Sequence, residues 1–132
     1  MPGFHHVELW VGELEEAQEE WGWLLDRLRF ELESTWADGQ SWRAGDAYLT
    51  VTTSPNLSTP VHDRRRAGVN HLAFKMESAT EVDAIIQEAP AHGWRPLYQD
   101  RYPHAGGKDH YAGWIENSAG FKAEIVACPS SE

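Results

Sequence analysis

One order of elements, a strand followed by a helix and three strands, is predicted twice along the chain. In the first copy, strands are expected over residues 4–11, 30–36, 40–44 and 47–53, with a helix over the apolar stripe from Leu14 to Leu28. In the second copy, strands are expected over 69–76, 94–99, 110–116 and 121–127, with a helix that begins at a capping box of Ser78 and Glu81. Such a repeat implies two similar halves that complete each other's core.

The repeat predicts an α+β fold made of two βαβββ modules in tandem, which together form a curved mixed sheet around a cavity. The modules are expected at about 4–53 and 69–127 within a single domain of residues 1–132. The stretch 54–68 contains Pro55, Pro60 and three consecutive arginines, a composition typical of a loop between modules.

Two histidines occupy corresponding positions in the two copies, His6 in HHVELWV and His71 in NHLAFKM. Because side chains alternate along a strand, both are expected on the strand face opposite to the apolar residues that pack on the helices. Glu124 has the same phase in the last strand. Two imidazoles and one carboxylate suit a divalent metal ion with open positions. On the residues alone, hydrogen-bonded core histidines remain an equal alternative.

Charge and composition exclude several classes of protein. The formal net charge of −10 disfavours a nucleic-acid partner, since the polyanionic backbone would be repelled. No apolar run approaches the length of a membrane span, and no secretory signal precedes the first strand, so a soluble cytoplasmic protein is expected. The single cysteine, Cys128, cannot form an intrachain disulfide.

Three segments resemble the vicinal oxygen chelate superfamily of glyoxalase I, fosfomycin-resistance proteins, bleomycin-resistance proteins and extradiol dioxygenases. They are HHVELWVGELEEAQEEWGWLL at 5–25, GVNHLAFKM at 68–76 and ENSAGFKAEIVA at 116–127. The resemblance spans essentially the whole chain, and two further segments, WGWLLDRLRFELESTWADGQSW and YPHAGGKDHYAGW, resemble a bacterial glyoxalase-like branch.

The resemblance implies a site in which His6, His71 and Glu124 bind a divalent metal ion, Mn, Fe, Ni or Zn. Glyoxalase I has a fourth, carboxylate ligand, and the matching position here is Thr50. A hydroxyl is a poor substitute for a carboxylate, so the three-ligand arrangement of fosfomycin-resistance enzymes and extradiol dioxygenases is expected.

Further residues are candidates around this metal site. Glu8 is expected on the face of His6, as a general base or as an ion-pair partner of Lys75 or Lys122. Tyr111 is expected to point inward as a second catalytic residue. Trp10, Lys108 and His110 are candidates for substrate binding, with core packing the alternative for Trp10 and plain surface exposure the alternative for His110.

The expected function is that of a metal-dependent glyoxalase-like enzyme that coordinates two oxygens of a small-molecule substrate. Its reaction class stays open among lyase, isomerase, epoxide-opening transferase and dioxygenase. The alternative is a resistance protein that binds an antibiotic or an aromatic metabolite, such as the bleomycin resistance protein, without catalysis. Members of the family often pair modules within or between chains, so a homodimer is expected.

Overall fold

The computed structural model describes residues 2–129. The chain divides into two compact units, Met1–His62 and Asp63–Glu132, and the boundary falls within the stretch 54–68. Each unit contains one copy of the repeated order of elements, and each is described by itself.

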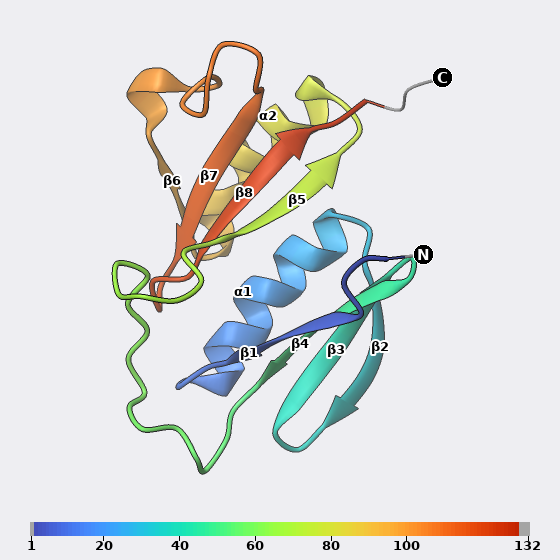
Figure 1. Ribbon diagram of the computed structural model, residues 1–132, viewed down its shortest axis with the longest axis vertical. Coiled ribbons are helices and arrows are strands. Elements are labelled where there is room, and N and C mark those ends of the chain that lie inside the picture. Colours follow the sequence, from blue (N-terminus) through green and yellow to red (C-terminus); the bar gives the residue numbers. More distant parts are fainter. Residues whose placement is uncertain (1, 130–132) are drawn as a thin grey trace. The chain divides into compact units, whose positions relative to one another are not determined.

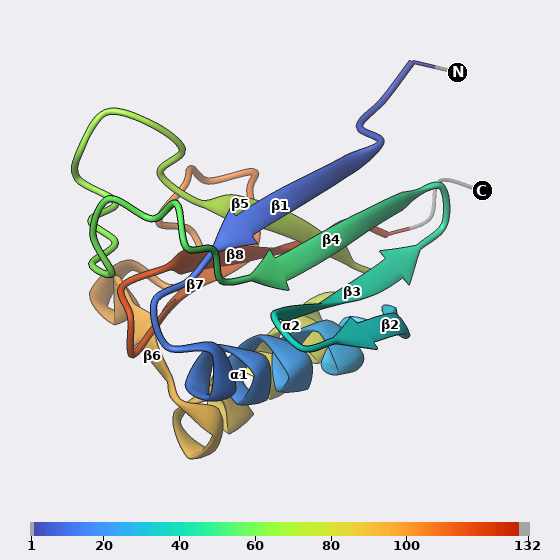
Figure 2. The same cartoon turned by 90° about the horizontal axis from the view of Figure 1, so that it is seen from below.

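The first unit contains a four-stranded mixed sheet and one long helix (Figure 1). Its elements are β1 (His6–Trp10), α1 (Leu14–Arg27), β2 (Glu31–Trp36), β3 (Gly39–Ala44) and β4 (Ala47–Thr52). The strand order is β1-β4-β3-β2, with β1 parallel to β4 and the other pairs antiparallel. Because a parallel pair needs a crossover, the chain passes through α1, which lies against one face of this sheet (Figure 2).

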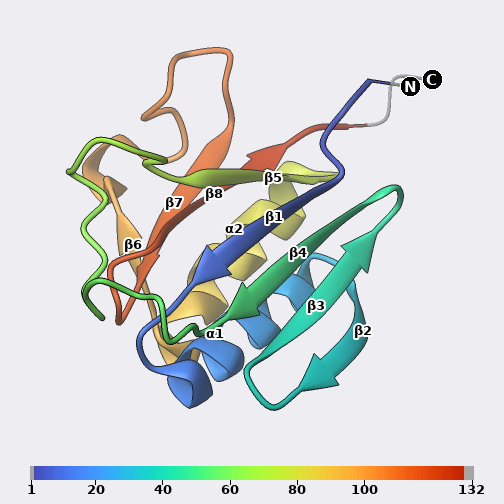
Figure 3. The same cartoon turned by 60° about the horizontal axis from the view of Figure 1, so that its bottom comes forward.

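The second unit repeats this topology with the order β5-β8-β7-β6 (Figure 3). Its elements are β5 (Leu72–Met76), α2 (Ala79–Glu88), the 3-10 turn η1 (Ala89–His92), β6 (Trp94–Leu97), the 3-10 turn η2 (Gln99–Arg101), β7 (Ala112–Asn117) and β8 (Lys122–Ala127). Here β5 is parallel to β8, and the remaining pairs are antiparallel. The predicted α+β class and the repeated βαβββ order are confirmed.

Apolar side chains at helical spacing explain how each helix packs on its sheet. In α1, Trp21, Leu24 and Leu25 are fully buried, as the apolar stripe predicts. In α2, Val82, Ile85 and Ile86 are buried, and the Ser78 hydroxyl caps the helix by accepting from the Glu81 N–H. A Cβ atom at Gly113 of β7 would lie 2.4 Å from Ile86 Cδ1, so only glycine allows this close approach of α2.

Seven of the eight observed strands are shorter than predicted, whereas β3 begins one residue before its predicted start. His71 lies just before β5, and His110 lies two residues before β7, so neither belongs to a strand. Strand β6 ends at Leu97 because Tyr98 has a left-handed backbone with φ of 58°, which interrupts the extended conformation.

Within residues 2–129, no helix has both the length and the apolar character required to cross a membrane.

Candidate functional site

Glu124 is a buried carboxylate at the centre of the second sheet. It lies in β8 between Ala73 of β5 and Trp114 of β7, and 7% of its surface is exposed. Its neighbours Ala123 and Ile125 point to the other face, where α2 packs. A buried carboxylate is costly unless its oxygens are hydrogen-bonded or bind a cation, so its partners are informative.

His71 supplies the partner of one carboxylate oxygen. Its Nε2 lies 3.0 Å from Glu124 Oε1, and its Nδ1 lies 2.8 Å from Asn70 Oδ1. The Asn70 amide nitrogen donates to the Arg64 carbonyl, which turns the amide oxygen towards the imidazole. Nδ1 therefore donates to Asn70, and Nε2 is the ring nitrogen that faces Glu124 and would offer its lone pair to a metal ion bound there.

His110 contacts the second carboxylate oxygen, with its Nε2 2.5 Å from Glu124 Oε2. The structure thus brings together His71 and Glu124, both predicted as metal ligands, and His110, predicted as a substrate-binding residue. Sequence reasoning missed the contact of His110 with Glu124, because it depends on the path of the loop before β7.

His6 lies in the first unit, on the edge strand β1. Its exposed imidazole stacks on Tyr48 with 4.7 Å between ring centres, and its Nδ1 lies 2.9 Å from His5 Nδ1. In the part of the chain that the structure describes, residues 2–129, no group of three or more His, Cys, Asp and Glu side chains is arranged to hold a metal ion.

Glu8 and Trp10 follow His6 on β1 and contact each other. The Trp10 indole N–H donates to Glu8 Oε2 at 2.6 Å, and both side chains are exposed. Thr50 pairs in register with Glu8 on the neighbouring strand β4. The Thr50 hydroxyl is buried and lies 2.7 Å from the Ser41 hydroxyl, so it already has a hydrogen-bond partner within its own sheet.

The expected inward orientation of Tyr111 is wrong. Its hydroxyl donates to Asp83 Oδ1 of α2 at 2.6 Å, and the Tyr102 hydroxyl donates to the same oxygen. Because side chains alternate along a strand, Tyr111 lies on the same side as Gly113, which contacts α2. Glu124 is in register with Trp114, which lies on the other face. Tyr111 therefore anchors the loop before β7 to the helix. Lys108 is exposed in that loop.

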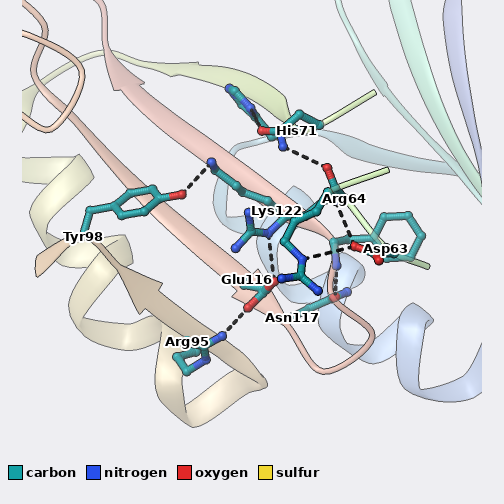
Figure 4. A network of polar contacts seen from close by, with 11 residues as sticks. Asp63, Arg64, His71, Arg95, Tyr98, Glu116, Asn117 and Lys122 are labelled. Carbon is teal, nitrogen blue, oxygen red and sulfur yellow. Dashed lines mark hydrogen bonds and ion pairs between the residues drawn. The ribbon is translucent and has the colours of Figure 1, made fainter. Parts of the chain in front are cut away.

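A network of charged side chains occupies the face of the second sheet that carries Glu124 (Figure 4). Arg64 Nε donates to Glu116 Oε2 at 2.9 Å, and Arg95 donates to the other oxygen of the same carboxylate. Lys122 Nζ donates to the Tyr98 hydroxyl at 2.8 Å. This hydrogen bond lowers the pKa of Tyr98, against the opposing effect of burial. The sequence did not predict this network.

Trp42 and Trp114 are buried in their sheets, with 4% and 8% of their surfaces exposed. Trp42 faces α1, where it lies 3.7 Å from the position of a Cβ at Gly22. Trp114 packs with Leu97 and Ala112 and makes an edge contact with Tyr98. Core packing therefore accounts for both indoles.

Comparison with known proteins gives consistent matches. The family model described as the Glyoxalase/Bleomycin resistance protein/Dioxygenase superfamily matches residues 5–114. The uncharacterized protein YqjT of Bacillus subtilis (strain 168) is 40% identical over 124 residues, covering 93% of this chain and 97% of that protein. A crystal structure from Bacillus halodurans, provisionally named a glyoxalase, is 41% identical with a TM-score of 0.88 and 95% coverage of both chains.

A more distant structure shares the fold alone. It is a mutant of the fosfomycin resistance protein FosX from Listeria monocytogenes, in complex with Mn(II) and 1S,2S-dihydroxypropylphosphonic acid. It is 16% identical to this chain, with a TM-score of 0.66, and the match covers 96% of this chain and 90% of that one.

Proposed function

Because the chain belongs to the glyoxalase/bleomycin resistance protein/dioxygenase superfamily, we propose that it is a metal-dependent enzyme that acts on a small substrate through two neighbouring oxygens. The observation that carries this proposal is the convergence of His71 Nε2 and Glu124 Oε1, 3.0 Å apart, on the face of the second sheet away from α2.

The donor set on this face fits a divalent metal ion. Asn70 leaves Nε2 of His71 as the available ring nitrogen, and the buried Glu124 carboxylate needs a cation or hydrogen-bond donors beside it. We propose His71 and Glu124 as two ligands and His6 of the first unit as the third. Nitrogen and oxygen donors of this kind suit Mn, Fe, Ni or Zn.

When bound, such an ion would act as a Lewis acid towards two vicinal oxygens of the substrate. The protein would supply the groups that hold and move protons around it. Glu8 is the proposed base, and the Trp10 indole N–H holds one of its oxygens, which orients the other. Thr50 brings no fourth carboxylate, so the proposed site has three protein ligands and open positions for substrate. This arrangement suits a lyase, an isomerase, an epoxide-opening transferase or a dioxygenase.

The competing hypothesis, a binding protein for an antibiotic or an aromatic metabolite, needs exposed aromatic surface. Trp42 and Trp114 do not provide it, since both are buried in the packing of their own sheets. Trp10 and Trp36 are 42% and 41% exposed, but they lie on β1 and β2, the opposite edge strands of the first sheet, and the Trp10 indole N–H is already bonded to Glu8. The arrangement of the tryptophans therefore gives less support to sequestration than the pairing of His71 with Glu124 gives to a metal site.

We also propose a homodimer. Leu32 and Trp36 are exposed on β2, an edge strand of the first sheet, with 55% and 41% of their surfaces open to solvent. Exposed apolar side chains on a sheet edge are stabilised when another chain covers them. Sedimentation equilibrium should give twice the 14.9 kDa mass of the chain, and the variant L32E/W36E should shift the mass towards one chain. A wild-type protein that sediments as one chain at all concentrations would contradict this proposal.

Metal binding is the direct test of the enzyme hypothesis. Protein purified in the presence of Mn²⁺, Ni²⁺, Fe²⁺ or Zn²⁺ should retain about one equivalent of one of these ions by elemental analysis. His71→Ala, Glu124→Gln and His6→Ala should each weaken binding by tenfold or more, on the order of the effects seen for losses at metal sites. Turnover would then be screened with hemithioacetals, epoxides and catechols.

An exposed histidine away from the proposed ligands provides a matched control. His92→Ala removes an exposed imidazole from the second unit. This variant should retain the metal with nearly wild-type affinity. A wild-type protein that binds none of the ions would refute the enzyme hypothesis and leave the binding-protein hypothesis as the better one.

A further inference from the structure

Three basic side chains surround the Tyr98 phenol on the Glu124 face of the second sheet. Lys122 Nζ donates to the Tyr98 hydroxyl at 2.8 Å and lies 4.9 Å from the ring centre. The Arg101 guanidinium carbon lies 5.3 Å from the same ring centre. The Arg64 guanidinium and the Lys122 ammonium both lower the pKa of the phenol, Lys122 more strongly. Figure 4 shows the Tyr98 hydroxyl facing the Lys122 amine.

The carboxylates near this cluster pair with its arginines rather than with Lys122. Arg101 Nε lies 4.0 Å from Asp100 Oδ1. Arg64 and Arg95 share a single carboxylate, that of Glu116, which they reach from opposite sides in Figure 4. Among residues 2–129, the Lys122 ammonium donates to the Tyr98 hydroxyl and takes part in no ion pair. The uncompensated charge of Lys122 is a local feature, since the whole chain carries a formal net charge of −10. An anion would meet a favourable potential here and a repulsive one over most of the surface.

The backbone at Tyr98 fixes the phenol in this place. Tyr98 has φ of 58° and ψ of 34°, a left-handed conformation that a residue with a bulky side chain seldom adopts. The ring is held by an edge contact with Trp114 at 5.8 Å between ring centres. Strain of this kind persists where the surrounding contacts hold it, and it is concentrated at functional sites.

We propose that Tyr98, Lys122 and Arg64 form a subsite for an oxyanion, the carboxylate or phosphate group of a small anionic substrate. Since the Tyr98 oxygen accepts from Lys122, its own proton can be donated to the anion. The Lys122 ammonium keeps further N–H groups for the same purpose, and Arg64 adds its charge.

The position of Lys122 sets the expected size of the substrate. Lys122 and Glu124 are alternate residues of β8 on the same face, so their Cα atoms lie about 7 Å apart. This step rests on the proposed function: if Glu124 binds the metal ion, the anionic group of the substrate lies only a few bonds from the two oxygens that chelate it. We therefore expect a small substrate that contains both an oxyanion and two vicinal oxygens.

The test uses inorganic phosphate and acetate as probes of the full-length protein stripped of metal with EDTA and then dialysed. Titration followed by 1H–15N NMR at constant ionic strength should give saturable shifts of the amides around Tyr98 and Lys122. Lys122→Met should weaken phosphate binding by about tenfold, Tyr98→Phe by several-fold, and Lys122→Arg should restore most of the affinity. The stronger of the two probes identifies the preferred oxyanion.

Lys75→Met is the matched control, because Lys75 is exposed in β5 with the same phase as Ala73, which is in register with Glu124. It should leave phosphate binding within about twofold of wild type, because Lys75 is outside the cluster around Tyr98. Equal losses in Lys75→Met and Lys122→Met would show that only general charge attracts the anion and would overturn the proposal. Absence of saturable binding by the wild type would also overturn it. Because the metal is removed, these outcomes are independent of whether the protein binds a metal.

Discussion

At the scale of single residues, the candidate site depends on side chains that hold other side chains. Asn70 fixes the tautomer of His71, and His110 occupies the Glu124 oxygen that His71 does not contact. One carboxylate is thus held at both oxygens. Partners of this kind matter for a metal site because they fix the orientation of the ligands before the ion binds.

His110 gives the sharpest test of this arrangement. His110→Ala should raise the dissociation constant of the metal by roughly tenfold. Effects of this size are usual when a residue that hydrogen-bonds to a metal ligand is removed. His110→Gln should retain most of the affinity, because the glutamine amide can donate to Glu124 from nearly the position of Nε2. Isothermal titration calorimetry with the preferred ion measures both values. Equal losses in the two variants would mean that His110 does not act through its hydrogen bond to Glu124.

The three proposed ligands and the supporting residues differ in how far the sequence reveals them. His6 and His71 are recognisable because they occupy equivalent places in the repeat, and Glu124 because of its phase in a strand. The roles of Asn70, His110 and Tyr98 depend on loop paths and on a left-handed backbone, and no periodicity encodes these. The wrong orientation of Tyr111 has the same origin, because its loop turns the phenol towards α2.

At the scale of elements, one carboxylate ties the loop before β7 to α2. Tyr102 and Tyr111 both donate to Asp83 Oδ1. Burial and the Asp83 hydrogen bond raise the pKa of Tyr102, and for Tyr111 the Asp83 hydrogen bond is the larger cause. We call these two hydrogen bonds to Asp83 the tyrosine clamp. Because the loop also carries Lys108 and His110, the tyrosine clamp fixes the position of one end of the candidate site.

The tyrosine clamp should make the free energy of unfolding depend on pH in the alkaline range. A raised pKa means that the folded protein keeps both phenolic protons after the unfolded chain has lost them, so the free energy of unfolding should fall as the pH rises above about 10. Asp83→Asn removes a carboxylate charge that contributes to both raised pKa values, so the free energy of unfolding of this variant should fall less steeply over this range. Urea titrations at pH 8, 9.5 and 10.5 measure the two slopes, and the effect of Tyr98 is common to both proteins. Parallel slopes would contradict the assignment of the clamp.

The elements themselves are well predicted where packing follows a regular period. The stripe of Trp21, Leu24 and Leu25 predicted α1, and the Ser78 cap predicted the start of α2. Strand ends are less predictable, because β6 ends at a tyrosine in a conformation usual for glycine. Apolar alternation records burial, whereas the last residue of a strand depends on local backbone contacts.

At the scale of the whole molecule, the repeat predicted most of the architecture. Both units have the same strand order relative to their own elements, β1-β4-β3-β2 and β5-β8-β7-β6. The substrate cannot be predicted in this way, because the fold supports several reactions and the groups that distinguish them lie on loops and exposed faces.

The strand order also governs when each sheet can form during synthesis on the ribosome. In both units, the strand made first pairs only with the strand made last: β1 with β4, and β5 with β8. His6 therefore obtains no native sheet partner until the chain up to Tyr48 has been made, and the strand after His71 waits in the same way for Ala123. Each half leaves its first strand, next to a proposed ligand, unpaired until nearly all of that half has left the ribosome.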